Sequence, residues 1–312
     1  MIATLTLPLS AQELCEAVRH ARPFNAARLD RVLRLDASRG LVEVQASASW
    51  QSLAAYLRPS ALDAAALWSD AAGIGESVAT NAAGPDGRPI VAHIEALVLV
   101  TADGELRRAS RSVNPELFAL AVGGQGIFGA AYSVTLSLES LARASAQASA
   151  AATLSLPGAS GASRVLQLLV PPASSEAFLG EARARCGQWR VAIEGAEVRR
   201  TLAENETLLR WAKREYAAIT LRLAGPPALG GSVRATQLRR ELIDSAIAHG
   251  GSFPIASTPD ATHAQVERCY PELKRVLADK RRLDPAERLA NSWYRHHRSL
   301  LGRGSCEVRW ER

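Results

Sequence analysis

The amino-acid sequence predicts an α+β protein in which helices and short strands alternate along the chain. Its 312 residues are 47% hydrophobic and 22% charged, which is typical of a soluble globular protein with a sizeable core. Segments with alternating apolar residues are separated by tight turns, and segments with apolar residues at helical intervals lie between them. Two glycine-rich runs, at residues 73–84 and 121–130, stand at connections between these elements.

The first 138 residues divide into short elements. Ser10 and Glu13 have the spacing of a capping box, so a helix is expected from about residue 10 to 21. An Asp-Gly turn at residues 103–104 joins two strands. Periodicity predicts the remaining elements, which are strands at 32–35, 41–45, 94–100, 105–108 and 130–138 and a helix at 50–57.

Residues 139–164 are rich in Ala and Ser and predict a boundary before a second region. Pro226-Pro227 and Gly230-Gly231 mark turns or loops within that region. The sequence patterns predict helices near 175–186 and 233–249, strands near 189–193 and 217–223, and two final helices at 262–279 and 284–298.

The excess of basic residues indicates a solvated basic face or a patch that attracts an anionic small molecule. The net charge is +6, the pI is about 9.5, and much of the excess falls in residues 280–282 and 295–298. Nucleic-acid interfaces interleave such charges with aromatic residues that stack on bases, and these clusters do not. We therefore expect no nucleic-acid partner.

A cytoplasmic protein without an integral membrane segment is expected. No run approaches the roughly 18 apolar residues that a spanning helix needs. Residues 1–8 lack the basic start and the cleavage site of a signal peptide. The cysteines, at positions 15, 186, 269 and 306, lie far apart without CxxC spacing, so neither a metal site nor a disulfide framework is expected.

The run GIGESVATNAAG at residues 73–84 is expected to form a connection whose backbone a large, flat, polar cofactor approaches. Its glycines can adopt positive φ and leave room, and its polar residues stand beside backbone N–H donors. A tight turn that packs a helix on a sheet explains the same run equally well. The residues concerned are Gly73, Gly75 and Gly84, with Ser77, Thr80 and Asn81.

The second run, AVGGQGIFGA at residues 121–130, lies immediately before a predicted strand. It also implies backbone brought close to a neighbour. It is not a Rossmann fingerprint, because that motif follows a strand and opens a helix.

With both runs in place, residues 42–138 resemble the FAD-binding domain of the vanillyl-alcohol-oxidase/PCMH superfamily. The resemblance rests on the strings GIGESVATNAAG, TADGE, NPELF and GGQGIFG in this order. The chain looks most like the branch of aldonolactone oxidases, polyol oxidases and the decaprenylphosphoryl-ribose oxidase. Residues 269–293, CYPELKRVLADKRRLDPAERLANSW, resemble the closing segment of that branch, and residues 248–257 are similar to its strand that ends at the flavin ring.

The resemblance implies a PCMH-type domain of two α/β subdomains, the first truncated, with a reduced α+β substrate cap. The implied limits are 1–138 for the FAD-binding domain, 139–252 for the cap and 253–312 for a segment that returns to the FAD domain. The implied cofactor is FAD. Its implied contacts are Gly73, Ile74, Gly75, Ser77, Val78, Ala79, Thr80, Asn81, Gly84, Gly129 and Ala130.

The resemblance also implies an FAD-linked oxidase or dehydrogenase acting on CH–OH groups. A hydroxylated small molecule, such as a sugar, lactone or polyol, would pass a hydride to flavin N5. No catalytic residue is assigned. Two alternatives stay open: a non-catalytic member of the fold that binds flavin weakly or not at all and acts through partner contacts, and a subunit completed by another chain.

Departures from the family pattern keep these alternatives open. Residues 22–30 stand where the family has a Gly-rich pyrophosphate loop. Glu76 replaces a glycine of the FAD loop, and Ala83 replaces a frequent histidine. Ser257 stands where the decaprenylphosphoryl-ribose oxidase group has its catalytic lysine, and a serine cannot supply that positive charge.

Two other candidates come from charge and position. His93 begins a predicted strand beside the first glycine run and is the histidine with the strongest case for a functional role. Residues 280–282 are expected to be a helix-end charge cluster, with contact to a cofactor phosphate as the alternative.

Overall fold

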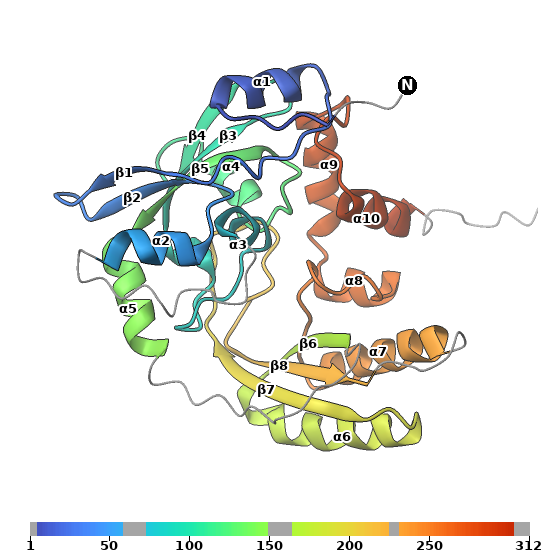
Figure 1. The fold of residues 1–312 in the computed structure, drawn as a ribbon. Helices are drawn as coiled ribbons and strands as arrows, with labels where there is room; N and C mark the ends of the chain where they lie inside the picture. The colour runs from blue at the N-terminus through green and yellow to red at the C-terminus, as the bar shows by residue number, and fades with distance from the viewer. Residues whose placement is uncertain (1–4, 59–72, 149–163, 225–230, 303–312) are drawn as a thin grey trace, which may run out of the picture. The chain divides into compact units, whose positions relative to one another are not determined.

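The computed structural model describes residues 5–58, 73–148, 164–224 and 231–302 (Figure 1). Its residues fall into two compact units. The first unit comprises residues 1–151, 204–210 and 274–295, and the second comprises 152–203, 211–273 and 296–312. The expected domain limits at residues 138 and 252 stay a prediction.

The first unit is built on a five-stranded antiparallel sheet with the strand order β1-β2-β5-β3-β4. The central pairing joins Val134 of β5 to Val44 of β2 on one side and to Leu97 of β3 on the other, and all three side chains are fully buried. β5 is the last strand of this sheet along the chain but lies at its centre, so the sheet is complete only when β5 pairs with β2 and β3. The strands are β1 (Val32–Asp36), β2 (Leu41–Gln45), β3 (Ile94–Val100), β4 (Leu106–Ser110) and β5 (Ala130–Ser137).

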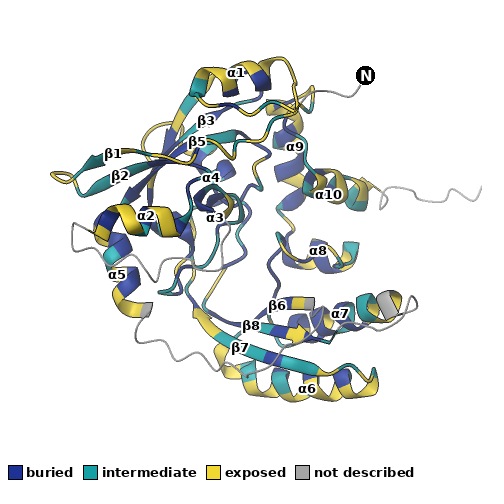
Figure 2. Cartoon of the chain, in the orientation of Figure 1, coloured by how far each residue is buried: buried dark blue, intermediate teal, exposed yellow. Residues whose placement is uncertain are grey.

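Helices cover this sheet, and the buried residues gather where helices and strands meet (Figure 2). Trp50 and Leu53 of α2 and Ile74 of α3 belong to one cluster of buried side chains, together with residues of β2, β3 and β5. The helices of this unit include α1 (Ala11–Arg19), α2 (Trp50–Leu57), α3 (Ile74–Thr80), α4 (Pro115–Ala121) and α5 (Leu138–Ala148), with a 3-10 turn at Ile90–His93.

The second unit contains a three-stranded antiparallel sheet with the strand order β6-β8-β7. Helices α6 and α7 pack on each other, and α7 packs on β6. The elements are β6 (Arg164–Val170), β7 (Ile193–Thr201), β8 (Tyr216–Leu223), α6 (Ser175–Gln188), α7 (Gly231–Ala248) and α8 (His263–Cys269).

The first glycine run differs from the expected connection because residues 74–80 form the helix α3. Gly73 precedes it in an extended conformation, with φ −169°, and Asn81 ends it in the left-handed region, with φ 50°. The expected positive φ of the glycines occurs instead in the second run, at Gly123 and Gly126. Gly75 of the first run therefore serves close helix packing, whereas Gly123 and Gly126 of the second run serve backbone conformation.

The predicted capping box is half formed. The Ser10 hydroxyl accepts the backbone N–H of Glu13 at 3.2 Å, as the pattern predicts. The Glu13 carboxylate accepts the N–H of Leu9 at 3.0 Å, one residue before the expected partner. The helix still starts at Ala11, because the Ser10 side chain caps it by accepting the N–H of Glu13.

The strand predicted near 189–193 is misplaced, because β7 begins at Ile193 and runs to Thr201. Trp189 instead ends α6: its backbone N–H bonds to the carbonyl of Arg185 at 3.0 Å, and its indole N–H bonds to Glu241 at 2.9 Å. Tertiary contact thus overrides the local strand preference of this aromatic residue.

The C-terminal helices are also divided differently from the prediction. The helix expected at 262–279 is two helices, α8 and α9 (Leu273–Leu283), because Pro271 cannot donate the hydrogen bond that would continue the first. The helix expected at 284–298 begins only at Ser292, as α10 (Ser292–Gly302). Glu287 has φ 50°, which a continuous helix excludes.

Other sequence expectations have mixed outcomes. The predicted boundary segment begins with α5, and its residues 149–163 lie outside the described part of the chain. The Pro- and Gly-containing turn predicted at 226–230 also lies outside it. Within residues 248–257, Ser252 forms an isolated bridge with Leu169 rather than a strand. In the described ranges, no helix combines the length and apolarity that crossing a bilayer requires.

Candidate functional site

The two glycine runs meet in the first unit through direct backbone hydrogen bonds. The N–H of Gly123 bonds to the carbonyl of Val78 at 2.9 Å, and the N–H of Gln125 bonds to the carbonyl of Ala79 at 2.9 Å. Gly123, Gln125 and Gly126 hold φ values of 76°, 56° and 71°, so this loop turns through the left-handed region three times. Segments far apart in the sequence thus form one surface.

This surface forms one wall of a cavity of about 610 Å³, which we call the glycine-lined cavity. Its volume lies within the range of about 300–1,000 Å³ that is usual for sites of small molecules and cofactors. Most of its lining residues carry small or apolar side chains. They are Phe24, Asn25, Ala26, Ala27, Ala46, Ser47, Gly73, Gly75, Glu76, Val78, Ala79, Leu99, Ala121, Gly126, Gly129, Ala130, Ala131 and Leu289.

At two glycines of this wall, neighbouring protein atoms leave no room for a Cβ atom. A Cβ atom on Gly75 would lie 2.7 Å from the carbonyl oxygen of Ala46. A Cβ atom on Gly129 would lie 3.0 Å from Cβ of Leu99. A Cβ atom on Gly73 would meet its nearest atom at an ordinary 3.6 Å. Close packing of α3 and the loop onto the sheet is therefore enough to explain Gly75 and Gly129.

The structure brings six of the eleven sequence-predicted contact residues to this cavity, and their contact with a cofactor stays a prediction. These six are Gly73, Gly75, Val78, Ala79, Gly129 and Ala130. The other five, Ile74, Ser77, Thr80, Asn81 and Gly84, are outside its lining.

Protein groups engage those five residues. Ile74 is fully buried in the core. The Ser77 hydroxyl accepts the indole N–H of Trp50 at 2.9 Å and donates to the carbonyl of Gly73 at 3.0 Å. Thr80 donates to the carbonyl of Glu76, Asn81 accepts the N–H of Val91, and Gly84 donates to the carbonyl of Arg88.

Among the lining residues that the structure describes, Glu76 alone has an ionisable side chain, and Glu76 is exposed. Within the described part of the chain, no arginine, lysine or histidine belongs to the lining. A flat, uncharged ring fits such a wall. An anionic group inside it would meet the negative charge of Glu76 with no cation in the lining to offset it.

Sequence reasoning missed several lining residues, chiefly residues 24–27, Ala46, Ser47 and Leu289. The pair Ala26-Ala27 and the small residues that follow β2 are the available signals, since small residues beside a glycine run leave space. Leu289 had no local signal, because it reaches the cavity from the C-terminal part of the chain.

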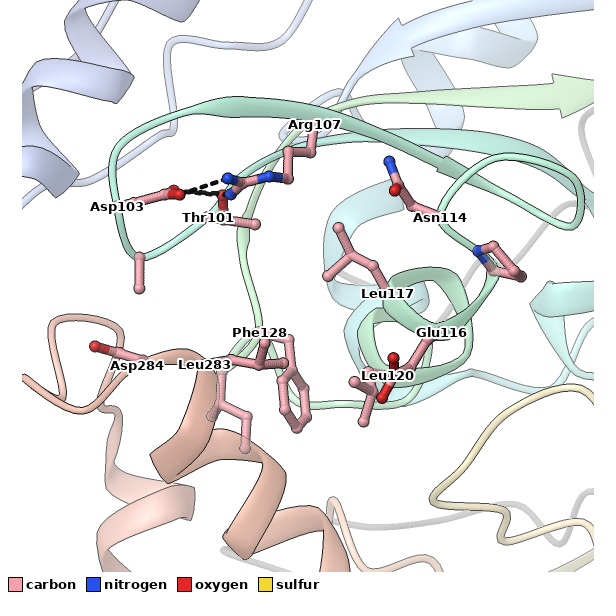
Figure 3. Close-up of a pocket in the computed structure, with 13 residues that line it drawn as sticks. Thr101, Asp103, Arg107, Asn114, Glu116, Leu117, Leu120, Phe128, Leu283 and Asp284 are labelled. Carbon is pink, nitrogen blue, oxygen red and sulfur yellow. Dashed lines mark hydrogen bonds and ion pairs between the residues drawn. The ribbon is translucent and has the colours of Figure 1, made fainter.

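A second cavity of about 560 Å³ lies between the β3–β4 turn, α4 and the end of α9 (Figure 3). Leu117, Leu120, Phe128 and Leu283 give it an apolar interior. On its rim, Arg107 binds the Asp103 carboxylate through two contacts of 2.9 and 2.6 Å, and this pairing holds the pKa of Asp103 well below its ordinary value. The arginine here is thus already engaged.

His93 is part of the protein interior. Its Nδ1 lies 2.7 Å from the Ser140 hydroxyl, and its Nε2 lies 3.6 Å from the Asp86 carboxylate. Burial raises the pKa of Asp86, but His93 and Arg88 lower it by more, so the pKa lies below its ordinary value. These contacts explain His93 as a residue that ties α5 to the turn before β3.

Lys280 is also buried. Of the charge cluster expected at residues 280–282, only Arg281 and Arg282 are exposed to solvent. The Lys280 ammonium pairs with the Asp284 carboxylate and lies 5.8 Å from the centre of the Tyr294 ring. Asp284 also accepts the N–H groups of Arg288 at 3.0 Å and Leu289 at 2.9 Å. Burial raises the pKa of Asp284, while Lys280 and these N–H donors lower it by more. The pair therefore fixes the turn that presents Leu289 to the cavity.

One comparison with known proteins identifies the class of domain. Residues 20–110 match a family described as an FAD binding domain, which indicates FAD as the cofactor. This match supports the vanillyl-alcohol-oxidase/PCMH superfamily, and the two antiparallel sheets with their helices agree with the predicted α+β fold of PCMH type. No curated protein matches the chain.

The residues of the glycine-lined cavity fit part of this cofactor well. The matched segment contributes residues 24–27, Ala46, Ser47 and the lining part of α3. Glycine and alanine walls of this size suit the flat isoalloxazine ring, and Asn25 and Ser47 add polar groups. The diphosphate needs positive charge or N–H donors, and the side chains of the described lining residues include no cation.

Proposed function

We propose that the protein is an FAD-dependent oxidoreductase whose cofactor occupies the glycine-lined cavity. The observation that carries this proposal is the junction of the two glycine runs, made by the bonds from Gly123 to Val78 and from Gln125 to Ala79, within a unit that contains the matched FAD-binding segment. A backbone surface free of large side chains allows a planar ring to approach closely.

The chain's own residues would bind and orient this ring. Val78, Leu99, Ala121 and Leu289 line the cavity and would exclude water from the ring. When bound, the flavin supplies an acceptor for a hydride. We propose as substrate a hydroxylated small molecule, such as a sugar, lactone or polyol, because the resemblance is strongest to oxidases of such compounds.

The test begins with the purified chain. We expect flavin absorption bands in the protein as isolated, or saturable uptake of added FAD measured by flavin fluorescence. A chain that carries no flavin and takes up none would refute the proposal and would favour a non-catalytic member of the fold. Oxidation of the sugar, lactone and polyol classes would then be screened by bleaching of the bound flavin without oxygen.

A pair of variants locates the cofactor. Ala79→Leu adds a larger side chain at the cavity wall, whereas Ala55→Leu makes the same change on the exposed face of α2, outside the lining. We expect Ala79→Leu to weaken FAD binding at least tenfold, equivalent to about 1.4 kcal/mol, and Ala55→Leu to leave it unchanged. Equal FAD affinity in the two variants would remove the cavity as the site.

A further inference from the structure

The second cavity of the first unit, which we call the leucine-lined cavity, is separate from the glycine-lined cavity. Its volume is about 560 Å³, and the two cavities share none of their described lining residues. Ile127 and Phe128 line the leucine-lined cavity. Their neighbours Gly126 and Gly129 line the glycine-lined cavity, so one short stretch of chain contributes to both.

The interior of the leucine-lined cavity is apolar (Figure 3). Leu117 and Leu120 lie three residues apart and so share one face of α4. Phe128 comes from the loop after α4, and Leu283 is the last residue of α9. The volume lies within the range of about 300–1,000 Å³ that is usual for sites of small molecules.

Leu283 lies where this cavity meets solvent. It is 44% exposed, whereas Leu120 and Phe128 are only 3% and 5% exposed and form the interior. Apolar surface in contact with water is unfavourable, and a molecule seated against these side chains would remove that surface from water. The cavity therefore offers apolar contact that the described part of the chain leaves uncovered.

The charged side chains of this lining already have counter-charges. The pairs are Asp103 with Arg107, Glu116 with Arg282 at 3.1 Å, and Asp284 with Lys280. Among the described lining residues, three carboxylates stand against one guanidinium. A charged ligand would have to displace one of these partners, and an anion would also meet the excess of negative charge.

The uncharged polar side chains of the lining also have protein partners. The Thr101 hydroxyl donates to the Asp103 carboxylate at 2.7 Å. The side-chain amide of Asn114 donates to the carbonyl of Arg108 at 2.7 Å. A ligand that hydrogen-bonds here would compete with these bonds, so burial of apolar surface is the main source of affinity that the cavity offers.

We propose that the leucine-lined cavity binds an uncharged, apolar small molecule, seated between Leu117 and Leu120 of α4, Phe128 and Leu283. This site is distinct from the one that we propose for FAD. Its occupant is recognised by shape and apolar contact, and no charged group of the ligand is needed.

The experiment uses two fluorescent probes that share one aromatic skeleton. Phenylnaphthylamine is uncharged, and anilinonaphthalenesulfonate carries an added sulfonate. Both brighten when they leave water, so fluorescence titration of the full chain gives their dissociation constants. We expect phenylnaphthylamine to bind about tenfold more tightly, because the lining disfavours an anion.

Variants place the probe in the cavity. Leu117→Trp fills part of the volume and should weaken phenylnaphthylamine binding about tenfold. Leu283→Asn makes the mouth polar and should weaken it about three- to tenfold, since a partly exposed leucine contributes less than a fully buried one. Leu33→Trp and Leu33→Asn are the matched controls, because Leu33 is 39% exposed on β1 and outside both linings.

Two further measurements make the result decisive. Ala79→Leu narrows the glycine-lined cavity and should leave phenylnaphthylamine binding unchanged. Melting temperatures show whether each variant is folded, and Leu283→Asn carries the test if Leu117→Trp is not, because Leu283 is already partly exposed.

Several outcomes would overturn the proposal. They are no binding of phenylnaphthylamine by the full chain, equal binding by a folded cavity variant and its Leu33 control, and tighter binding of the sulfonate. A loss in Ala79→Leu with no loss in Leu117→Trp or Leu283→Asn would assign the probe to the glycine-lined cavity instead. None of these measurements requires FAD, so they can fail while the proposed function holds.

Discussion

Gly75 packs directly against the backbone of Ala46. Its N–H donates to the Ala46 carbonyl at 2.6 Å, and a Cβ atom on Gly75 would lie 2.7 Å from that same oxygen. The first glycine run therefore has a structural cause that is independent of any ligand. Substitutions here separate the packing of α3 from the binding of a cofactor.

Gly75→Ala should destabilise the first unit, because the new methyl group must displace backbone rather than a flexible side chain. We expect a loss of about 1 to 3 kcal/mol, the usual result of overpacking. Gly73→Ala is the matched control: its φ of −169° suits any residue, and its Cβ would meet Ala48 O at 3.6 Å. Urea unfolding of both variants measures the difference, and equal stability would contradict the packing explanation.

Glu76→Gln should strengthen FAD binding, because it removes a negative charge from the cavity lining. An exposed charge contributes about 0.2 to 1 kcal/mol, so the gain should be up to about fivefold in affinity. Fluorescence titration with FAD and riboflavin checks it. The gain should be confined to FAD, and an equal change for both ligands would show that charge is not the cause.

Removal of one member of the Lys280–Asp284 pair should destabilise the first unit strongly. Lys280→Met leaves a carboxylate that is 3% exposed without its cation, and such a loss amounts to about 3–5 kcal/mol. Adding Asp284→Asn should recover part of it, since the amide oxygen can still accept the N–H groups of Arg288 and Leu289. Unfolding free energies of the single and double variants test this coupling, and simple additivity would contradict it.

Glu181 makes the stability of the second unit depend on pH. Arg185, which donates at 2.7 and 3.0 Å, the Ser245 side chain and His249, at 3.1 Å, together lower the pKa of Glu181 to about 2 from an ordinary value of 4.5. Because the folded pKa is lower, this stabilisation is complete above about pH 4.5 and is lost as the pH falls toward 2.

The variant Glu181→Gln should therefore melt at a lower temperature than the unaltered chain at pH 7, and the difference should shrink as the pH falls through this window. Glu176→Gln, an exposed change on the same helix, is the control. If the difference in melting temperature stayed constant from pH 7 to acid pH, ionised Glu181 would not be the source of the stabilisation. Thermal denaturation followed by circular dichroism at several pH values measures it.

Local patterns predicted many elements of the first unit because its strands alternate and its turns are short. The β1 and β2 strands, α2, β3 and β5 lie within one or two residues of their expected limits. Predictions were wrong where contacts that periodicity does not encode decide the local structure. Trp189 ends a helix, and its indole N–H bonds to Glu241, 52 residues away. The error after α9 has a local cause: the Asp284 carboxylate accepts the N–H groups of Arg288 and Leu289, and apolar periodicity does not predict these bonds.

The sequence by itself determined the α+β class, the two glycine runs and the resemblance to an FAD-binding domain, because periodicity and short motifs are properties of neighbouring residues. Only the tertiary structure decided that the two runs are bonded to each other, that Ser77 and Asn81 have protein partners, and that residues 24–27 and Leu289 share one cavity. Those relations join residues that are far apart along the chain, and no local periodicity encodes a distance between them.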